Sequence, residues 1–210
     1  MRDMEKFIKS KLLKADLVEI DKQFEDSGFK DMSSIILFKH AFVTIANLVD
    51  FELTVRSIYA ERRNLSTIYA EASKEFEFAK YLRNKFIGHI NPELLEKAIG
   101  WRPEMRYILK GTDEPEVMFM YNLWVLETAI NTYVKPDGSH RLFESETDFI
   151  YSPDRKRFLI FLTHVVKSGI EYLKALSKVL ANKVEMLDHT KQDLEHWLSS
   201  GKTEFKYIKK

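Results

Sequence analysis

The stretch that decides the fold is SPDRKRFLIFLTHVVKSGIEYLKALSKVLANKVEML, residues 152–187. Ser152, Pro153 and Asp154 mark a helix start, because the fixed φ of proline suits the first helical turn. Apolar residues then recur with helical spacing over more than about eight turns. They are Leu162, Val166, Leu173, Leu176, Leu180, Val184 and Leu187. A helix with one long apolar face must pack against other helices.

The same periodicity predicts further helices on both sides of the chain. The first of these helices has an apolar stripe that consists of Leu13, Leu17, Ile20 and Phe24, and the helix is expected to end at Ser27-Gly28. Ser33 or Ser34 is expected to cap a long, apolar and central helix over residues 33–63. Other helices are expected over residues 71–86, 92–100 and 191–198. Asn91-Pro92-Glu93 provides the cap and first turn of the helix over residues 92–100.

The segment from 101 to 151 is the least regular part of the chain. Residues 117–134 suit a helix, and Lys135-Pro136-Asp137-Gly138 is a strong turn signal. We therefore expect a small β-hairpin or an irregular insertion around residues 132–150. The fold class expected is all-α, an antiparallel helical bundle of about six to seven helices. Residues 1–210 are expected to form a single domain with a variable insertion at about 101–151.

Composition excludes several classes of protein. The chain has no cysteine, which rules out disulfides, thiolate catalysis and cysteine zinc sites. The first residues are charged and the longest apolar runs are shorter than the roughly 20 residues of a membrane span. We therefore expect a cytoplasmic protein that has no membrane partner. The net charge is only +1, but residues 80–110 carry seven Lys or Arg against three Glu. Such a basic segment suits contact with a polyanion, although solvated helix faces of differing sign account for it equally well.

Within this basic segment lies AKYLRNKFIGHINP, residues 79–92, where Arg83 and Asn84 are followed by His89. The order and spacing of these three residues resemble the arginine, polar residue and histidine signature of HEPN domains. That family consists of small all-helical proteins and includes metal-independent ribonucleases. The resemblance implies a homodimer in which two such motifs face each other across one groove. The family often has an aromatic residue soon after the histidine, whereas Ile90-Asn91-Pro92 follows here.

The three residues suit RNA cleavage without a metal. A histidine with a pKa of about 6.5 can deprotonate a ribose 2′-hydroxyl near neutral pH, so His89 is the expected general base. The guanidinium of Arg83 is expected to stabilise the charge that builds on the phosphate oxygens. Asn84 is expected to orient the phosphate or the imidazole. Four nearby cations are expected to bind substrate: Lys80, Lys85, Arg102 and Arg106. No metal and no cofactor is expected.

Other candidate sites are weaker. His189 and His196, with Asp188, Asp193 and Glu195, could be taken for a metal site, but a solvated terminal helix explains them better. His40 and His164 lie in apolar helices, where core or interface histidines are usual. Two basic clusters could bind a phosphate backbone or could simply lie at the ends of helices. They are Arg62-Arg63 and Arg155-Lys156-Arg157.

Three functions therefore stay open. The leading hypothesis is a HEPN-like, metal-independent endoribonuclease that acts as a homodimer in toxin–antitoxin or anti-phage defence, with a cognate antitoxin or defence partner. The alternative is a non-catalytic HEPN-like module that binds a nucleotide, RNA or protein. The third is a structural helical dimer whose basic segment meets an acidic partner.

Overall fold

The computed structural model describes residues 2–27, 31–88, 90–108 and 114–185, together with residues 198 and 201. Helices make up 79% of the structure described, and no strand occurs in it. This confirms the all-α fold class. Eight α-helices, one 3₁₀ turn and one π turn follow one another in the described chain.

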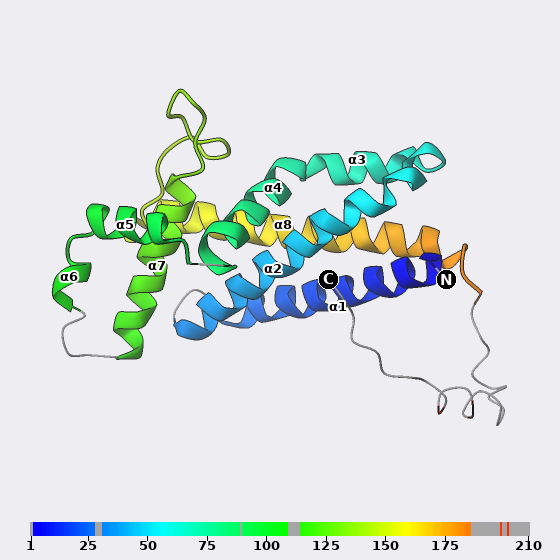
Figure 1. The fold of residues 1–210 in the computed structure, drawn as a ribbon, viewed down its shortest axis with the longest axis horizontal. Coiled ribbons are helices and arrows are strands. Elements are labelled where there is room, and N and C mark those ends of the chain that lie inside the picture. The colour runs from blue at the N-terminus through cyan, green and yellow to red at the C-terminus, as the bar shows by residue number, and fades with distance from the viewer. Residues whose placement is uncertain are drawn as a thin grey trace.

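Three long helices form the body of the molecule (Figure 1): α1 (Arg2–Ser27), α2 (Met32–Val55) and α8 (Ser152–Ala181). α1 and α8 lie side by side and antiparallel, and α2 packs against both. Gly169 of α8 allows this close approach, because a Cβ atom there would lie 2.8 Å from Leu17 Cδ1 and 3.1 Å from Ile45 Cδ1. The buried hydroxyls of Ser10 and Ser177, 2.9 Å apart, join α1 to α8.

The apolar helix α2 is central, as its sequence predicts. Residues 32–60 are the one helical stretch of the described chain with the length and hydropathy of a membrane span, with a mean hydropathy of 1.5. Its large apolar side chains, including Phe38, Phe42 and Ile45, are buried against the other helices. Core packing therefore accounts for its hydropathy. Its cap is Asp31, whose Oδ1 accepts the backbone N–H of Ser34, and not Ser33 or Ser34 as predicted.

The chain between α2 and the motif is more broken than its sequence suggests. α2 ends at Val55, and a 3₁₀ turn (Arg56–Ala60) follows in place of the predicted helix to residue 63. α3 (Arg63–Glu71) and α4 (Ser73–Leu82) then run one after the other, and a π turn (Arg83–Ile87) completes α4. The break at Ala72 lets Tyr69 and Phe76, whose ring centroids are 5.1 Å apart, both face the core.

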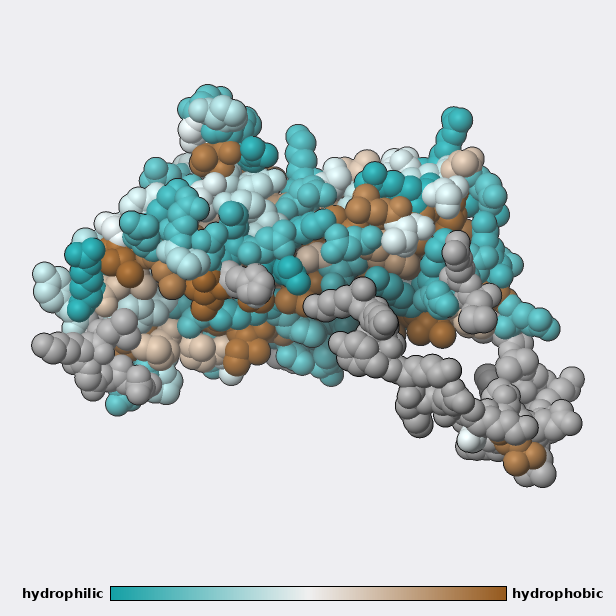
Figure 2. All heavy atoms as spheres, in the orientation of Figure 1, coloured by the Kyte–Doolittle hydropathy of each residue, from teal (hydrophilic) through white to brown (hydrophobic). Residues whose placement is uncertain are grey.

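The other end of the molecule consists of α5 (Pro92–Trp101), α6 (Met105–Ile108) and α7 (Pro115–Asn131). Residues 132–151 then form an irregular loop that projects from the body (Figure 1), and most of its visible surface is hydrophilic (Figure 2). One antiparallel bridge, between Val134 and His140, closes the predicted turn into a short hairpin.

The predicted boundaries near the C-terminus are partly wrong. α8 ends at Ala181, so Val184 lies beyond it, in a turn that begins at Asn182. Leu187 lies outside the described residues. The helix predicted over residues 191–198 also lies outside them, apart from residue 198. The prediction of a single domain remains a prediction.

Candidate functional site

The motif lies where α4 changes its helical pitch. The backbone N–H of Gly88 donates to the carbonyl of Arg83 over 2.8 Å, which is the i to i+5 bond of a π turn. Single π turns are rare and occur often at functional sites, because the extra residue widens the helix and redirects side chains. Asn91 then caps α5, with its Oδ1 accepting the N–H of Glu93 at 2.9 Å. Arg83 and Asn84 thus lie on the turn that follows α4 and precedes α5 in the chain.

The Arg83 side chain is exposed and held in place beside the backbone. Its Nη1 donates to Asn84 Oδ1 at 3.0 Å. A Cβ atom on Gly88 would lie 3.3 Å from the same Nη1, so the guanidinium rests over the glycine. No ion pair joins Arg83 to any residue that the structure describes. Because a guanidinium has five N–H donors, most of them remain available to an anion.

His89, the predicted general base, lies outside the described residues. Its flanking residues Gly88 and Ile90 are both exposed. The structure therefore brings Arg83 and Asn84 together and leaves the role of His89 a prediction.

The four predicted substrate-binding cations lie in different surroundings. Lys80 Nζ is 2.7 Å from Asp50 Oδ1 of α2, which neutralises its charge locally. Lys85 is half-buried and lines a small cleft of about 110 Å³ with Tyr81 and Lys97. Arg106 is exposed, and no described residue forms an ion pair with it.

Arg102 is fixed by carboxylates from other elements. Its Nη2 lies 2.7 Å from Glu127 Oε1 of α7 and 3.4 Å from Asp148 Oδ1 of the irregular loop. Burial works against the charge of Arg102, but the hydrogen bond and charge of Glu127 outweigh it and raise the pKa. Glu127 is itself buried and accepts the N–H of Phe149 at 2.9 Å. Arg102 therefore has a structural contact that ties α5 to α7 and to the loop.

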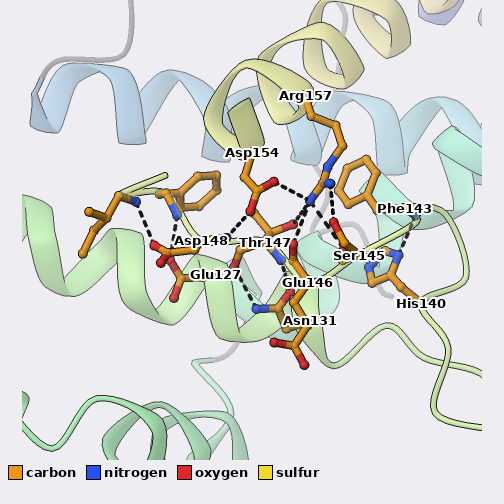
Figure 3. Close-up of polar contacts among 12 residues, drawn as sticks. Glu127, Asn131, His140, Phe143, Ser145, Glu146, Thr147, Asp148, Asp154 and Arg157 are labelled. Carbon is orange, nitrogen blue, oxygen red and sulfur yellow. Dashed lines mark hydrogen bonds and ion pairs between the residues drawn. The ribbon is translucent and has the colours of Figure 1, made fainter. Parts of the chain in front are cut away.

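Glu127 and Asp148 belong to a polar network that attaches the irregular loop to α7 and α8 (Figure 3). Asn131 bonds both the carbonyl and the N–H of Thr147, at 2.9 and 2.8 Å. Arg157 of α8 pairs with Asp154 at 3.2 Å and donates to Ser145 Oγ at 2.7 Å. The partners lie up to 46 residues apart in sequence, so no local pattern could have revealed them. Residues 111–154 contain nine Asp or Glu against two Lys or Arg, and this acidic surplus is the trace of the cluster in the sequence.

His140 is a further member of the network that the sequence did not single out. Its Nδ1 accepts two backbone N–H groups, those of Leu142 and Phe143, at 3.0 and 2.7 Å. Its Nε2 lies 3.0 Å from the carbonyl of Ile130 and must therefore carry the proton. Burial, and after it the charge of Arg157, lowers the pKa of His140, against the raising effect of the Ile130 carbonyl. The fold thus holds this imidazole neutral in one tautomer.

An apolar groove of about 450 Å³ begins beside the motif. Phe86 of the π turn and the exposed Ile90 line it, and α5, α6 and α7 supply its other walls. Its remaining lining residues are Leu95, Ile99, Met105, Arg106, Tyr121, Asn122 and Val125. Figure 2 shows apolar side chains reaching the surface at this end of the molecule. The sequence analysis missed the groove, because its walls come from four separate elements.

The weaker candidates can also be placed. His40 and His164 are exposed in the structure, so the interpretation as core histidines is wrong for both. In the described ranges no three His, Asp or Glu side chains gather in a way that could hold a metal ion. The possible metal set around His189 and His196 lies outside those ranges. Arg62, Arg63, Arg155 and Lys156 are exposed at the starts of α3 and α8.

Comparisons of the chain with protein-family models, with curated proteins and with solved structures returned no match.

Proposed function

We propose that this protein is a metal-independent endoribonuclease of the HEPN type. The observation that carries the proposal is the exposed Arg83 guanidinium, bonded to Asn84 on a π turn and free of any carboxylate among the described residues. An arginine that is held in position and has no carboxylate partner can bind a phosphate directly. An arginine in an ion pair must first lose its carboxylate partner. In this respect Arg83 differs from Arg102.

Each residue of the motif has one role in the proposed reaction. His89 removes the proton of a ribose 2′-hydroxyl, and the resulting oxygen attacks the adjacent phosphorus. Arg83 stabilises the negative charge on the phosphate oxygens, and Asn84 holds the guanidinium in position through their hydrogen bond. The bond from phosphorus to the 5′-oxygen breaks, which leaves a 2′,3′-cyclic phosphate. The leaving oxygen takes a proton from an acid in the second copy of a homodimer.

The proposal extends to the setting that the resemblance implies. The protein acts in the cytoplasm, in toxin–antitoxin or anti-phage defence, and a cognate antitoxin or defence partner restrains or triggers it. Lys85 and Arg106 are the better candidates for substrate contact, because Lys80 and Arg102 have carboxylate partners.

A variant series tests the proposal. Purified wild-type protein should cut single-stranded RNA in EDTA, and His89→Ala should lower the rate at least ~10²-fold, as loss of a general base usually does. Lys178→Ala serves as the control, because it also removes one basic side chain, and Lys178 is exposed on α8, outside the candidate site. Equal traces of activity in the wild-type and His89→Ala proteins would indicate contamination, and the proposal would be withdrawn.

The apolar groove favours a second candidate function, a non-catalytic HEPN-like module that binds a nucleotide, RNA or protein. A groove of about 450 Å³ with apolar walls and a cation at its edge has the size of many ligand sites. RNA or nucleotide binding that Arg83→Ala removes, without any cleavage by the wild-type protein, would favour this candidate.

A further inference from the structure

A second basic feature lies away from the motif, between α4 and the short hairpin. A cavity of about 490 Å³ opens there. α4 contributes Ser73, Lys74 and Glu77 to its lining, and the hairpin contributes Tyr133, Lys135, Arg141 and Leu142. Three cations thus face one carboxylate. None of the three forms an ion pair with a described residue. With Glu77 in the lining and Asp137 near Lys135 in the turn, the cavity still keeps a positive charge that suits an anion.

The hairpin holds its cations on a fixed frame. The N–H of Lys135 donates to the carbonyl of Ser139 at 2.8 Å, and Gly138 closes the turn with a φ of 83°, a conformation that favours glycine. Arg141 Nε donates to the carbonyl of Val134 at 2.9 Å, and its guanidinium lies 5.4 Å from the ring centre of Tyr133. The Arg141 guanidinium is thus held in place, so it has little conformational freedom to lose when it binds an anion.

Contacts along α4 connect this cavity to the motif. The rings of Tyr133 and Tyr81 lie 4.7 Å apart, and Tyr81 lines the small cleft that also contains Lys85, Glu93 and Lys97. Lys97 pairs with Glu93 at 3.9 Å, whereas Lys85 forms no ion pair with a described residue. Residues 74, 77 and 81 follow one another at intervals of three and four, which places them on one side of α4, and Lys85 follows in the π turn. The distance along the helix from 74 to 85 is roughly 17 Å. The π turn that bears Asn84 adjoins the end of this path.

We propose that α4 and the hairpin over residues 133–141 form a binding track for the phosphate backbone of single-stranded RNA, leading the strand to Arg83 and Asn84. The choice of RNA rests on the proposed endoribonuclease function. Lys74 and Lys85, at the two ends of this path and roughly 17 Å apart along the helix axis, can contact separate phosphates of one strand, whereas a free phosphate or a mononucleotide reaches only one of them.

The test measures binding of 2′-O-methyl RNA by fluorescence anisotropy. This RNA lacks the nucleophile, so binding is observed whether or not the protein cleaves RNA. The variant is Lys74→Glu with Lys135→Glu, both exposed. The matched control is Lys174→Glu with Lys178→Glu, which changes the net charge equally on exposed positions of α8. Circular dichroism checks that each variant keeps its helices.

For an oligonucleotide of about 15 nucleotides, the track variant should bind at least ~10-fold more weakly than wild type. The slope of log affinity against log salt should fall by about 1.4, since each phosphate contact on a single strand contributes about 0.7. An oligonucleotide of about 5 nucleotides should lose much less, because it can occupy the motif end alone. The α8 control should bind as wild type does.

Equal binding by wild type and the track variant, or an equal loss in the α8 control, would overturn the proposal. So would full displacement of the long oligonucleotide by inorganic phosphate at low millimolar concentration, which would assign the cavity to a free anion. Failure of the proposed function has a different signature. In that case cleavable RNA stays intact, while the length-dependent loss in the track variant persists and supports the binding track.

Discussion

At the scale of single residues, the core depends on one glycine. A side chain on Gly169 would meet three apolar atoms of two helices, at 2.8 Å on Leu17, 3.1 Å on Ile45 and 3.3 Å on Leu48. All three partners are fully buried, so they cannot all move away without cost. Gly100, in α5, has no atom within 4 Å of the corresponding position.

Gly169→Ala should therefore lower the free energy of unfolding by about 1–2 kcal/mol, because overpacking outweighs the gain in helix propensity. Gly100→Ala should raise it by about 0.5–1 kcal/mol, because only the propensity gain applies. Urea denaturation of both variants measures the two values. Equal effects of the two substitutions would mean that α1, α2 and α8 do not meet at Gly169.

His140 should make stability depend on pH. Its imidazole stacks on Phe143, with ring centroids 5.1 Å apart. The guanidinium of Arg157 lies 5.0 Å from the centre of the Phe143 ring, so a positive charge on His140 would be repelled by Arg157. Tyr133 packs edge-on against the imidazole ring of His140. The folded-state pKa lies below the unfolded value of about 6.5. The stabilisation is therefore present above about pH 6.5 and is lost as the pH falls through the folded pKa.

The urea midpoint of wild-type protein should accordingly drop more between about pH 7.5 and about pH 5.5 than that of His140→Asn, which cannot titrate in this range. The exposed His164 provides the control, since His164→Asn should keep the wild-type pH dependence. A His140→Asn protein with the full wild-type drop would show that another group causes it.

At the scale of elements, α5 depends on its cap. Asn91 Oδ1 accepts the N–H of Glu93, and Pro92 occupies the first turn. Asn91→Ala should cost about 1 kcal/mol, because the N–H loses its partner, and Asn91→Asp should cost little. Asn47 is exposed within α2, and Asn47→Ala should be neutral or slightly stabilising. Thermal unfolding of the three variants ranks them, and an unchanged melting temperature in Asn91→Ala would contradict the capping role.

Helices with explicit start signals could be predicted from the sequence. Pro92 and Pro153 each stand in the first turn of the helix expected of them, and the periodic apolar stripe of α8 is buried along its length. The cap of α2 was misplaced because Asp31, Ser33 and Ser34 are all good caps, and only the three-dimensional hydrogen bond distinguishes them. Tertiary packing of Tyr69 and Phe76 sets the break at Ala72, and no local residue signals it.

The candidate site was less accessible to sequence reasoning than the fold. The adjacency of Arg83 and Asn84 can be read from the sequence, but their hydrogen bond cannot, because consecutive side chains of a regular helix do not face each other. The π turn leaves no mark in the residue pattern, because it differs from an α-helix by a single hydrogen-bond shift. The carboxylates that hold Lys80 and Arg102 come from positions 25 to 46 residues away in the chain, so their pairing depends on how helices pack.

At the scale of the whole molecule, apolar side chains remain exposed near the motif. Ile90 is 53% exposed, Trp101 52% and Tyr107 82%, all at the end formed by α5 and α6. Exposed apolar surface of this kind often marks an interface. It agrees with the homodimer that the proposed function requires, in which the two copies complete one active site.

Analytical ultracentrifugation at micromolar concentration should give twice the mass of 24.8 kDa. The chain contains no cysteine, so Asn84→Cys and Lys178→Cys can each carry a single spin label. The distance between the two labels of a dimer should be shorter for position 84, which is expected near the two-fold axis. A strictly monomeric mass, or a longer distance at position 84, would contradict a composite active site.

The central claim is metal-independent cleavage of RNA by the Arg83 site, and the ends of the product test it most directly. Single-stranded RNA incubated with wild-type protein in EDTA should carry 2′,3′-cyclic phosphate and 5′-hydroxyl ends, as identified by mass spectrometry. Arg83→Lys should lower the rate by at least ~10²-fold, because a point charge cannot replace the planar fork of the guanidinium. Products with 5′-phosphate ends, cleavage that requires a divalent cation, or full activity in Arg83→Lys would contradict the account.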